Sequence, residues 1–328
     1  MTTRVLSGMQ PSGFMHLGNL LGALENWKSL QTQYECYFFV ADWHALSTNY
    51  ADTSRIKEFT QELLIDWLAA GIDPNRATVF VQSSIPEHAI LYLLLSMIVP
   101  IPWLERNPTY KEKQDEIKEK DLSTYGFLGY PVLQAADILL YKTDIVPVGK
   151  DQLPHLELTR EIGRRFNNLY SPVFPEPKEH LTQFPKVMGT DGRKMSKSYG
   201  NTINLSDTEP VVRQKLKTMV TDPARVRRTD KGNPDVCPVF DFHKIYSSAD
   251  VIKQVDQDCR TAAIGCIDCK RQVADAMVER YGPMWDKRAT ILQHPEQTQE
   301  MVEEGRKRAS HVAHETMQEV KTAMKILW

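Results

Sequence analysis

Residues 4–19, RVLSGMQPSGFMHLGN, join a short apolar run to a helical pattern through a turn that contains proline and glycine. Gly18 has no side chain, so a ligand can approach the backbone closely there. The helix opens at His16, and its free amides can face a phosphate. The stretch therefore predicts a phosphate-binding turn after the first strand, with His16 as a donor to phosphate. The alternative is a histidine that only caps the helix.

Short apolar runs alternate with helical patterns through the first 200 residues. The runs at 4–8, 36–42, 77–83 and 144–149 are typical of strands, and the patterns at 17–32, 54–70 and 153–166 are typical of helices. Such alternation predicts a parallel sheet that is covered by helices on both faces. Ligands of open α/β sheets bind beyond the carboxyl ends of the strands. Both HLGN and GKDQ (149–152) fall at such strand-to-helix turns.

The chain changes character after a stretch rich in turn residues at 199–207. From about residue 211 onward the pattern is mostly helical, and it ends in a long amphipathic helix at 296–327. The predicted fold class is therefore α/β, with a Rossmann-like, doubly wound parallel sheet and a second, smaller all-helical domain. We expect the catalytic domain at 1–205 and the helical domain at 206–328.

Composition indicates an ordinary globular protein. The 328 residues are 41% hydrophobic and 25% charged. The net charge of −2 does not indicate a nucleic-acid-binding protein, because such proteins usually have a basic excess. Basic clusters at 225–231 and 306–308 permit RNA binding without arguing for it. The longest apolar stretch, 89–104, is too short and too broken by proline to span a bilayer. With no export signal at the start of the chain, we expect a cytoplasmic protein.

A second motif, KMSKS at 194–198, lies about half the chain away from the first. Its two lysines and two serines form a polar, doubly cationic loop. If a nucleophile attacks the α-phosphate of a nucleotide, pyrophosphate leaves, and two ammonium groups stabilise the charge that grows in the transition state. His16, Lys194 and Lys197 are therefore the predicted catalytic residues. The alternative is a solvated lysine-serine loop.

Asp137 lies in an almost wholly apolar segment, YPVLQAADILLY (130–141). A buried carboxylate needs a hydrogen-bond donor, a cation or a ligand beside it. An indole N–H is a donor only, so an acceptor-only carboxylate suits tryptophan, although a tyrosine hydroxyl could also donate. The partner could equally be a protein group. In GKDQ, Asp151 suits either ligand binding or a helix N-cap.

The two motifs, in this order, are the signature of the class I aminoacyl-tRNA synthetases, and the chain closely resembles the bacterial tryptophanyl-tRNA synthetases from end to end. The likeness rests on MQPSGFMHLGNLLGAL (9–24), YPVLQAADILLY, DIVPVGKDQLPHLELTREIGRRFN (144–167) and KMSKS. It implies that the protein activates L-tryptophan with ATP and Mg²⁺ and transfers it to tRNA(Trp). It also implies a homodimer whose helical domain reads the anticodon.

The same resemblance implies the binding residues. Those for ATP are Gln10, Pro11, Ser12, Gly18, Asn19, Gly149, Lys150, Asp151, Val187, Lys194, Met195, Ser196, Lys197 and Ser198. Those for tryptophan are Asp137, Gln152, Tyr130 and His44. Two alternatives stay open. One is a tyrosyl-tRNA synthetase, and the other is a synthetase-like, redox-responsive RNA-binding protein.

Four of the five cysteines, Cys237, Cys259, Cys266 and Cys269, lie within the last third of the chain. In a cytosolic protein such a set, which includes a CxxC pair, indicates a metal site, and four thiolates suit either zinc or a [4Fe-4S] cluster. A subset of the bacterial tryptophanyl-tRNA synthetases carries a [4Fe-4S] cluster at nearly this spacing, with a first gap one residue longer. The resemblance therefore implies the cluster, with Zn²⁺ as the alternative.

Overall fold

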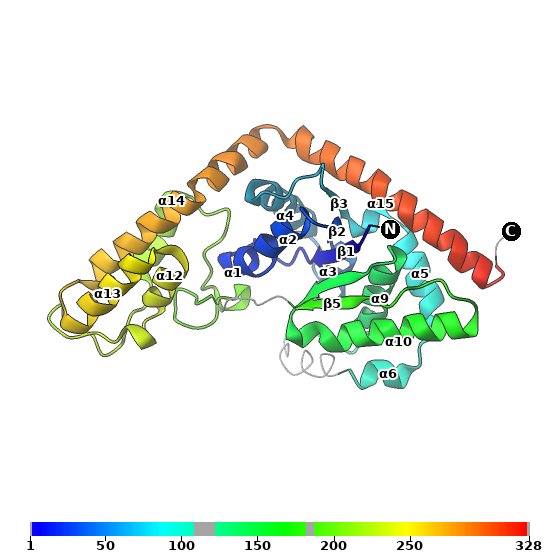
Figure 1. Cartoon of the computed structure of the whole chain (residues 1–328), viewed down its shortest axis with the longest axis horizontal. Coiled ribbons are helices and arrows are strands. Elements are labelled where there is room, and N and C mark those ends of the chain that lie inside the picture. The colour runs from blue at the N-terminus through cyan, green and yellow to red at the C-terminus, as the bar shows by residue number, and fades with distance from the viewer. Residues whose placement is uncertain (1, 108–121, 182–186, 327–328) are drawn as a thin grey trace.

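A parallel five-stranded sheet forms the centre of the molecule (Figure 1). The coordinates are a computed structural model that describes residues 2–107, 122–181 and 187–326. The strands are β1 (Arg4–Met9), β2 (Glu35–Val40), β3 (Ala77–Val81), β4 (Ile145–Val148) and β5 (Lys178–Leu181). Their order is β3-β2-β1-β4-β5, and every neighbouring pair is parallel. The predicted parallel sheet is confirmed.

Helices cover both faces of this sheet. Those of the first part are α1 (Leu17–Asn19), the π-helical turn η1 (Leu20–Leu24), α2 (Glu25–Leu30), α3 (Asp42–Asn49), α4 (Ile56–Ala70), α5 (Glu87–Ser96), α6 (Ile101–Glu105), α8 (Tyr125–Leu128), α9 (Tyr130–Leu140) and α10 (Leu153–Leu169). The later ones are α11 (Glu209–Thr218), α12 (Pro238–Tyr246), α13 (Ala249–Thr261), α14 (Cys266–Gln293) and α15 (Pro295–Ala323). Short 3₁₀ turns are η2 (Gln82–Ser84), η3 (Lys150–Gln152), η4 (Lys197–Tyr199) and η5 (Pro234–Val236). None of the described helices combines the length and the apolar character that crossing a membrane requires.

The central strands are apolar on both faces because each face is covered. In β2, Phe38 and Val40 belong to one core, with side chains of α1, α2 and α4. Tyr37 and Phe39 point the other way, into a second core with α5, α9 and α10. A strand buried on both sides reads as a continuous apolar run and not as an alternating one, which is why the sequence marks this strand clearly.

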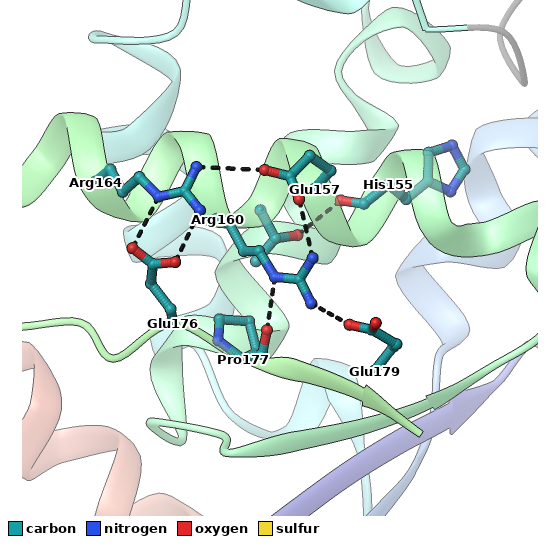
Figure 2. Close-up of polar contacts among 8 residues, drawn as sticks. His155, Glu157, Arg160, Arg164, Glu176, Pro177 and Glu179 are labelled. Atoms are coloured by element: carbon teal, nitrogen blue, oxygen red, sulfur yellow. Dashed lines mark hydrogen bonds and ion pairs between the residues drawn. The ribbon is translucent and has the colours of Figure 1, made fainter. Parts of the chain in front are cut away.

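The edge strand β5 is missing from the strands that the sequence predicts. Its four residues, KEHL, are all exposed, so no apolar pattern marks them. Figure 2 shows how α10 holds the segment: Arg164 pairs with Glu176, and Arg160 pairs with Glu179. Arg160 also donates from Nε to the carbonyl of Pro177 at 2.7 Å. Ladder bonds and ion pairs thus hold this strand in place of apolar burial.

The strand order reverses between β1 and β4, which lie side by side in the middle of the sheet. At such a switch point the loops diverge beyond the carboxyl ends of the strands and leave a crevice for a ligand. The PSGFMHLGN turn follows β1, and GKDQ follows β4. The fold therefore brings the two predicted turns to the same edge of the sheet.

The long helices α14 and α15 form an arch over the sheet and meet near residue 294 (Figure 1). The boundary predicted between residues 205 and 206 stays a prediction. The C-terminal helix, which that prediction assigns to the helical domain, packs against β3, α5 and α9 of the catalytic part. Its buried side chains Ala313 and Met317 belong to the second core of the sheet.

A buried ion pair links α14 to the catalytic part. Arg288 of α14 is 7% exposed and donates to the carboxylates of Asp66 and Glu62 on α4. Asp66 is buried, so leaving its carboxylate without this cation would strand a buried charge. The orientation of α14 relative to the sheet is therefore specified by charge as well as by apolar packing.

Replacing Gly305 by alanine should lower the free energy of unfolding by about 3 kcal/mol or more, because overpacking a rigid contact cannot be relieved by a flexible side chain. A Cβ at this position of α15 would collide with the backbone carbonyl oxygen of Val79 in β3. Gly282→Ala on α14 is the matched control, since a Cβ there meets nothing within 4 Å. Urea unfolding of both variants tests the contact, and an equal effect in both would contradict it.

Candidate active site

His16 begins α1 and forms both bonds of a capping box. Its Nδ1 accepts from the backbone N–H of Gly18 at 3.1 Å, and its own N–H donates to Oδ1 of Asn19 at 3.1 Å. Burial and the nearby charge of Lys197 lower the pKa of His16 to about 4, so the ring is neutral. Because Nδ1 accepts, the ring proton lies on Nε2. The histidine caps the helix and still offers an N–H donor.

Lys197 of KMSKS reaches across to the first motif. Its ammonium donates to the carbonyl of Gly13 at 2.9 Å and lies 3.4 Å from Oγ of Ser12. Burial lowers the pKa of Lys197 to about 8, against an opposing effect of the Asp66 carboxylate. Two motifs that are 184 residues apart at this contact thus form one site. Lys194, by contrast, is exposed.

The KMSKS loop depends on Asn201, a residue that sequence reasoning missed. Its side chain is 2% exposed, accepts from the N–H of Ser196 at 2.8 Å and donates to the carbonyl of Lys194 at 3.2 Å. Its amide also donates to Asp191 at 2.7 Å. A Cβ on Gly189 would collide with this asparagine. The signal in the sequence is faint, an asparagine three residues beyond the motif.

The other residues predicted for the nucleotide lie around these contacts. Pro11, Val187 and Met195 are buried, and the N–H of Met195 donates to the carbonyl of Val187 at 2.9 Å. Gln10 is half-buried and directly follows β1. The hydroxyls of Ser196 and Ser198 lie 2.9 Å apart. Their contacts to a nucleotide stay a prediction.

The GKDQ turn places its polar side chains at the carboxyl end of β4. Gly149 precedes the 3₁₀ turn η3, and Lys150 and Asp151 are exposed there. The alternative that Asp151 caps a helix is wrong, because neither η3 nor α10 has a side-chain N-cap bond. Asp151 instead accepts from Nε2 of Gln152 at 2.9 Å. Its carboxylate is therefore exposed and does not cap the helix backbone.

Asp137 of α9 is 1% exposed and accepts hydrogen bonds from three side chains. His44 donates from Nε2 to Oδ2 at 2.6 Å, Gln82 from Nε2 to Oδ1 at 2.8 Å, and His88 from Nδ1 to Oδ1 at 2.6 Å. Burial alone would raise the pKa of Asp137, but the two histidines outweigh it and the pKa lies below its ordinary value. The carboxylate is therefore ionised and rigidly held. Sequence reasoning named His44 and missed Gln82 and His88.

The four residues predicted for tryptophan form one connected group. The ring of Tyr130 stands edge-on to His44, with centroids 4.9 Å apart, and edge-on to His155 at 5.6 Å. Nδ1 of His155 lies 3.1 Å from Oε1 of Gln152. Tyr130 also lines a cavity of about 330 Å³, whereas Asp137 does not line it. The structure brings the residues together, and their role toward a ligand stays a prediction.

The four cysteines gather where α12, α13 and α14 meet. Cys237 precedes α12, Cys259 lies in α13, and Cys266 and Cys269 lie in the first turn of α14. Burial, followed by the charges of the other three cysteines, raises the pKa of Cys269 to about 12. Within the described ranges, no group of three or more histidine, cysteine or acidic side chains is arranged to hold a metal ion.

A doubly wound parallel sheet whose PSGFMHLGN turn is contacted by the lysine of a KMSKS loop is the arrangement of the class I tRNA synthetases. The family model for tRNA synthetases class I (W and Y) matches residues 1–282. The chain belongs to this family, whose two letters stand for tryptophan and tyrosine.

The following relatives are enzymes for tryptophan. A tryptophan–tRNA ligase of Thermotoga maritima is 54% identical over 327 residues, which cover 99% of this chain and 100% of that protein. One of Ralstonia nicotianae is 44% identical and covers 98% of each chain. The tryptophanyl-tRNA synthetase of Campylobacter jejuni, solved with ADP and tryptophan, is 32% identical with a TM-score of 0.90, over 98% of this chain and 100% of that one.

Proposed function

We propose that the protein is a tryptophan–tRNA ligase that acts in the cytoplasm. It activates L-tryptophan with ATP to the adenylate and then transfers the tryptophanyl group to the 3′ terminal ribose of tRNA(Trp). The observation that carries the proposal is the contact of Lys197 with the Gly13 carbonyl, because it brings the two sequence motifs together. The full-length identity to tryptophan–tRNA ligases supports tryptophan over tyrosine.

The chemistry needs no covalent nucleophile from the protein. The carboxylate of tryptophan attacks the α-phosphate in line, and pyrophosphate leaves. Nε2 of neutral His16 donates to phosphate oxygens, while Lys194 and Lys197 stabilise the negative charge of the leaving group. Asp151 and the amides at the start of η3 follow β4, which neighbours β1 in the sheet. Bound Mg²⁺ supplies further neutralisation of the phosphates.

Amino-acid-dependent exchange of pyrophosphate into ATP tests the proposal directly. We expect exchange with L-tryptophan and very little with L-tyrosine. A preference for tyrosine would make the protein a tyrosyl-tRNA synthetase. Exchange with neither amino acid would leave the redox-responsive RNA-binding alternative.

The activity should fall at alkaline pH because of Lys197. Its pKa is lowered to about 8, so the ammonium that holds phosphate loses its proton as the pH rises through that value. Since kcat/KM reports the free enzyme, kcat/KM for ATP should fall with an apparent pKa near 8. In Lys197→Arg the side chain stays charged through this pH range, so the fall in kcat/KM near pH 8 should disappear. If kcat/KM of the variant still falls near pH 8, the titrating group is not Lys197.

We propose that the protein acts as a homodimer through α5 and α6. Four large apolar side chains on this face, Ile90, Leu93, Met97 and Ile101, are between 40% and 70% exposed. A contiguous exposed apolar surface is typical of an interface. Sedimentation equilibrium should give a dimer, and Leu93→Asp with Met97→Asp should give monomers. A monomeric wild type would reject this surface.

We propose further that the four cysteines hold a [4Fe-4S] cluster, which places the protein in the iron-sulfur subset of its family. Four thiols with mutual electrostatic effects on Cys259 and Cys269 are a donor set of the right chemistry. Purification without oxygen should give about four irons and four sulfides per chain. Stoichiometric zinc without visible colour would support the Zn²⁺ alternative, and metal-free, fully active protein would reject both.

A further inference from the structure

The two oxygens of Asp137 have different hydrogen-bonding capacity left. Oδ1 accepts from Gln82 at 2.8 Å and from His88 at 2.6 Å, whereas Oδ2 accepts from His44 alone. A carboxylate oxygen has two lone pairs. Both lone pairs of Oδ1 are therefore used, and Oδ2 can still accept one hydrogen bond. The three donors fix the orientation of the carboxylate and so the direction of that bond.

The polar atoms around this carboxylate include a buried acceptor that has no partner among the described residues. Asp137 can only accept, so the amide nitrogen of Gln82 must face it and Oε1 must point away. Oε1 of Gln82 and Nδ1 of His44 are buried without a partner among the described residues. One N–H of the Gln82 amide and Nδ1 of His88 are thus committed to Asp137, and Oε1 of Gln82 remains an uncommitted acceptor.

Tyr141 fixes the proton of His88 in this arrangement. Nε2 of His88 lies 2.8 Å from the Tyr141 hydroxyl. Burial raises the pKa of Tyr141 well above its ordinary value, so the hydroxyl keeps its proton and can donate it to Nε2. The ring proton of His88 then lies on Nδ1, where it faces the carboxylate.

We propose that Gln82 and His88 are positioning residues that make the enzyme select an indole over a phenol. The inference rests on the proposed function, because it concerns the same amino-acid site. Gln82 and His88 fill Oδ1 and leave Oδ2 as a single, fixed acceptor for the indole N–H, which only donates. A phenol hydroxyl could donate there too, but its oxygen carries lone pairs that need a donor of their own when buried, a need that the indole N–H does not have.

Three amino acids serve as probes in the exchange assay: L-tryptophan, L-tyrosine and 3-(3-benzothienyl)-L-alanine, which keeps the shape of tryptophan without the N–H. In Gln82→Leu and His88→Leu, the ratio of kcat/KM for tryptophan to that for the benzothienyl analogue should fall by about tenfold or more. The ratio for tryptophan to tyrosine should fall with it. A merely structural role would lower kcat/KM for every probe by one factor and leave both ratios unchanged.

Two further variants keep the test decisive if a leucine variant folds poorly. Gln31→Leu is a matched control, because Gln31 is also buried but bonds only the backbone at Gly71 and Asp73. It should leave both ratios unchanged. His88→Asn keeps a donor near the position of Nδ1 and should restore most of the discrimination.

The outcomes separate this inference from the proposed function. A wild type that activates none of the three amino acids rejects the function itself. A wild type that activates tryptophan, with ratios that no variant at Gln82 or His88 changes, overturns the inference alone.

Discussion

Replacing Lys197 by methionine should lower kcat for tryptophan-dependent pyrophosphate exchange by about 10²–10³-fold, the usual cost of one group that stabilises transition-state charge. The Lys197 ammonium lies at the junction of the two motifs, on the carbonyl of Gly13. Charge grows on the leaving pyrophosphate as the reaction proceeds, so most of the loss should appear in kcat and less in KM for ATP.

Methionine matches the length and volume of the lysine stem, so the fold should tolerate this change. The variant also removes a largely buried ammonium, and its melting temperature should therefore not fall. Lys307→Met is the control, since Lys307 lies on the exposed face of α15 and pairs only with Glu304. A Lys197→Met enzyme with kcat close to that of the wild type would contradict the assignment of this lysine.

The sequence predicts those helices and strands that are marked by a pattern within their own residues. Phe38 and Phe39 lie on opposite faces of β2, and both faces are buried, so an unbroken apolar run announces the strand. β5 has no such signal because ion pairs with α10 and bonds to β4 hold it. The helical pattern of α15 is equally plain, but its packing on β3 depends on the missing side chain at Gly305, which no periodicity reveals.

The site divides in the same way. The turns that carry His16 and Lys197 are recognisable because short motifs fix their backbone and their charge. Gln82 and His88 are not, since their contacts with Asp137 span 55 and 49 residues and exist only when β3, α5 and α9 have packed together. The apolar setting of Asp137 does predict that donors must exist. It does not say which side chains provide them.

Replacing Asp137 by alanine should lower kcat/KM for tryptophan by about 10²-fold, as expected when a charged acceptor is lost from a buried hydrogen bond. KM for ATP should change by less than about threefold, because the residues predicted to bind ATP lie on other elements. The interaction that is lost is with the amino acid alone, in both the ground state and the transition state. Exchange kinetics with each substrate varied in turn separate the two effects.

The same change leaves the donors on His44, Gln82 and His88 without their acceptor, so the variant should also unfold about 3–5 kcal/mol more easily. The matched control is Asp222→Ala, which removes another buried carboxylate, one that accepts from the backbone of Ala224 at 2.9 Å and of Asn233 at 2.8 Å. It should lose stability and keep kcat/KM for tryptophan in the exchange reaction. Equal losses of tryptophan and ATP binding in Asp137→Ala would mean that this carboxylate supports the fold and does not select the substrate.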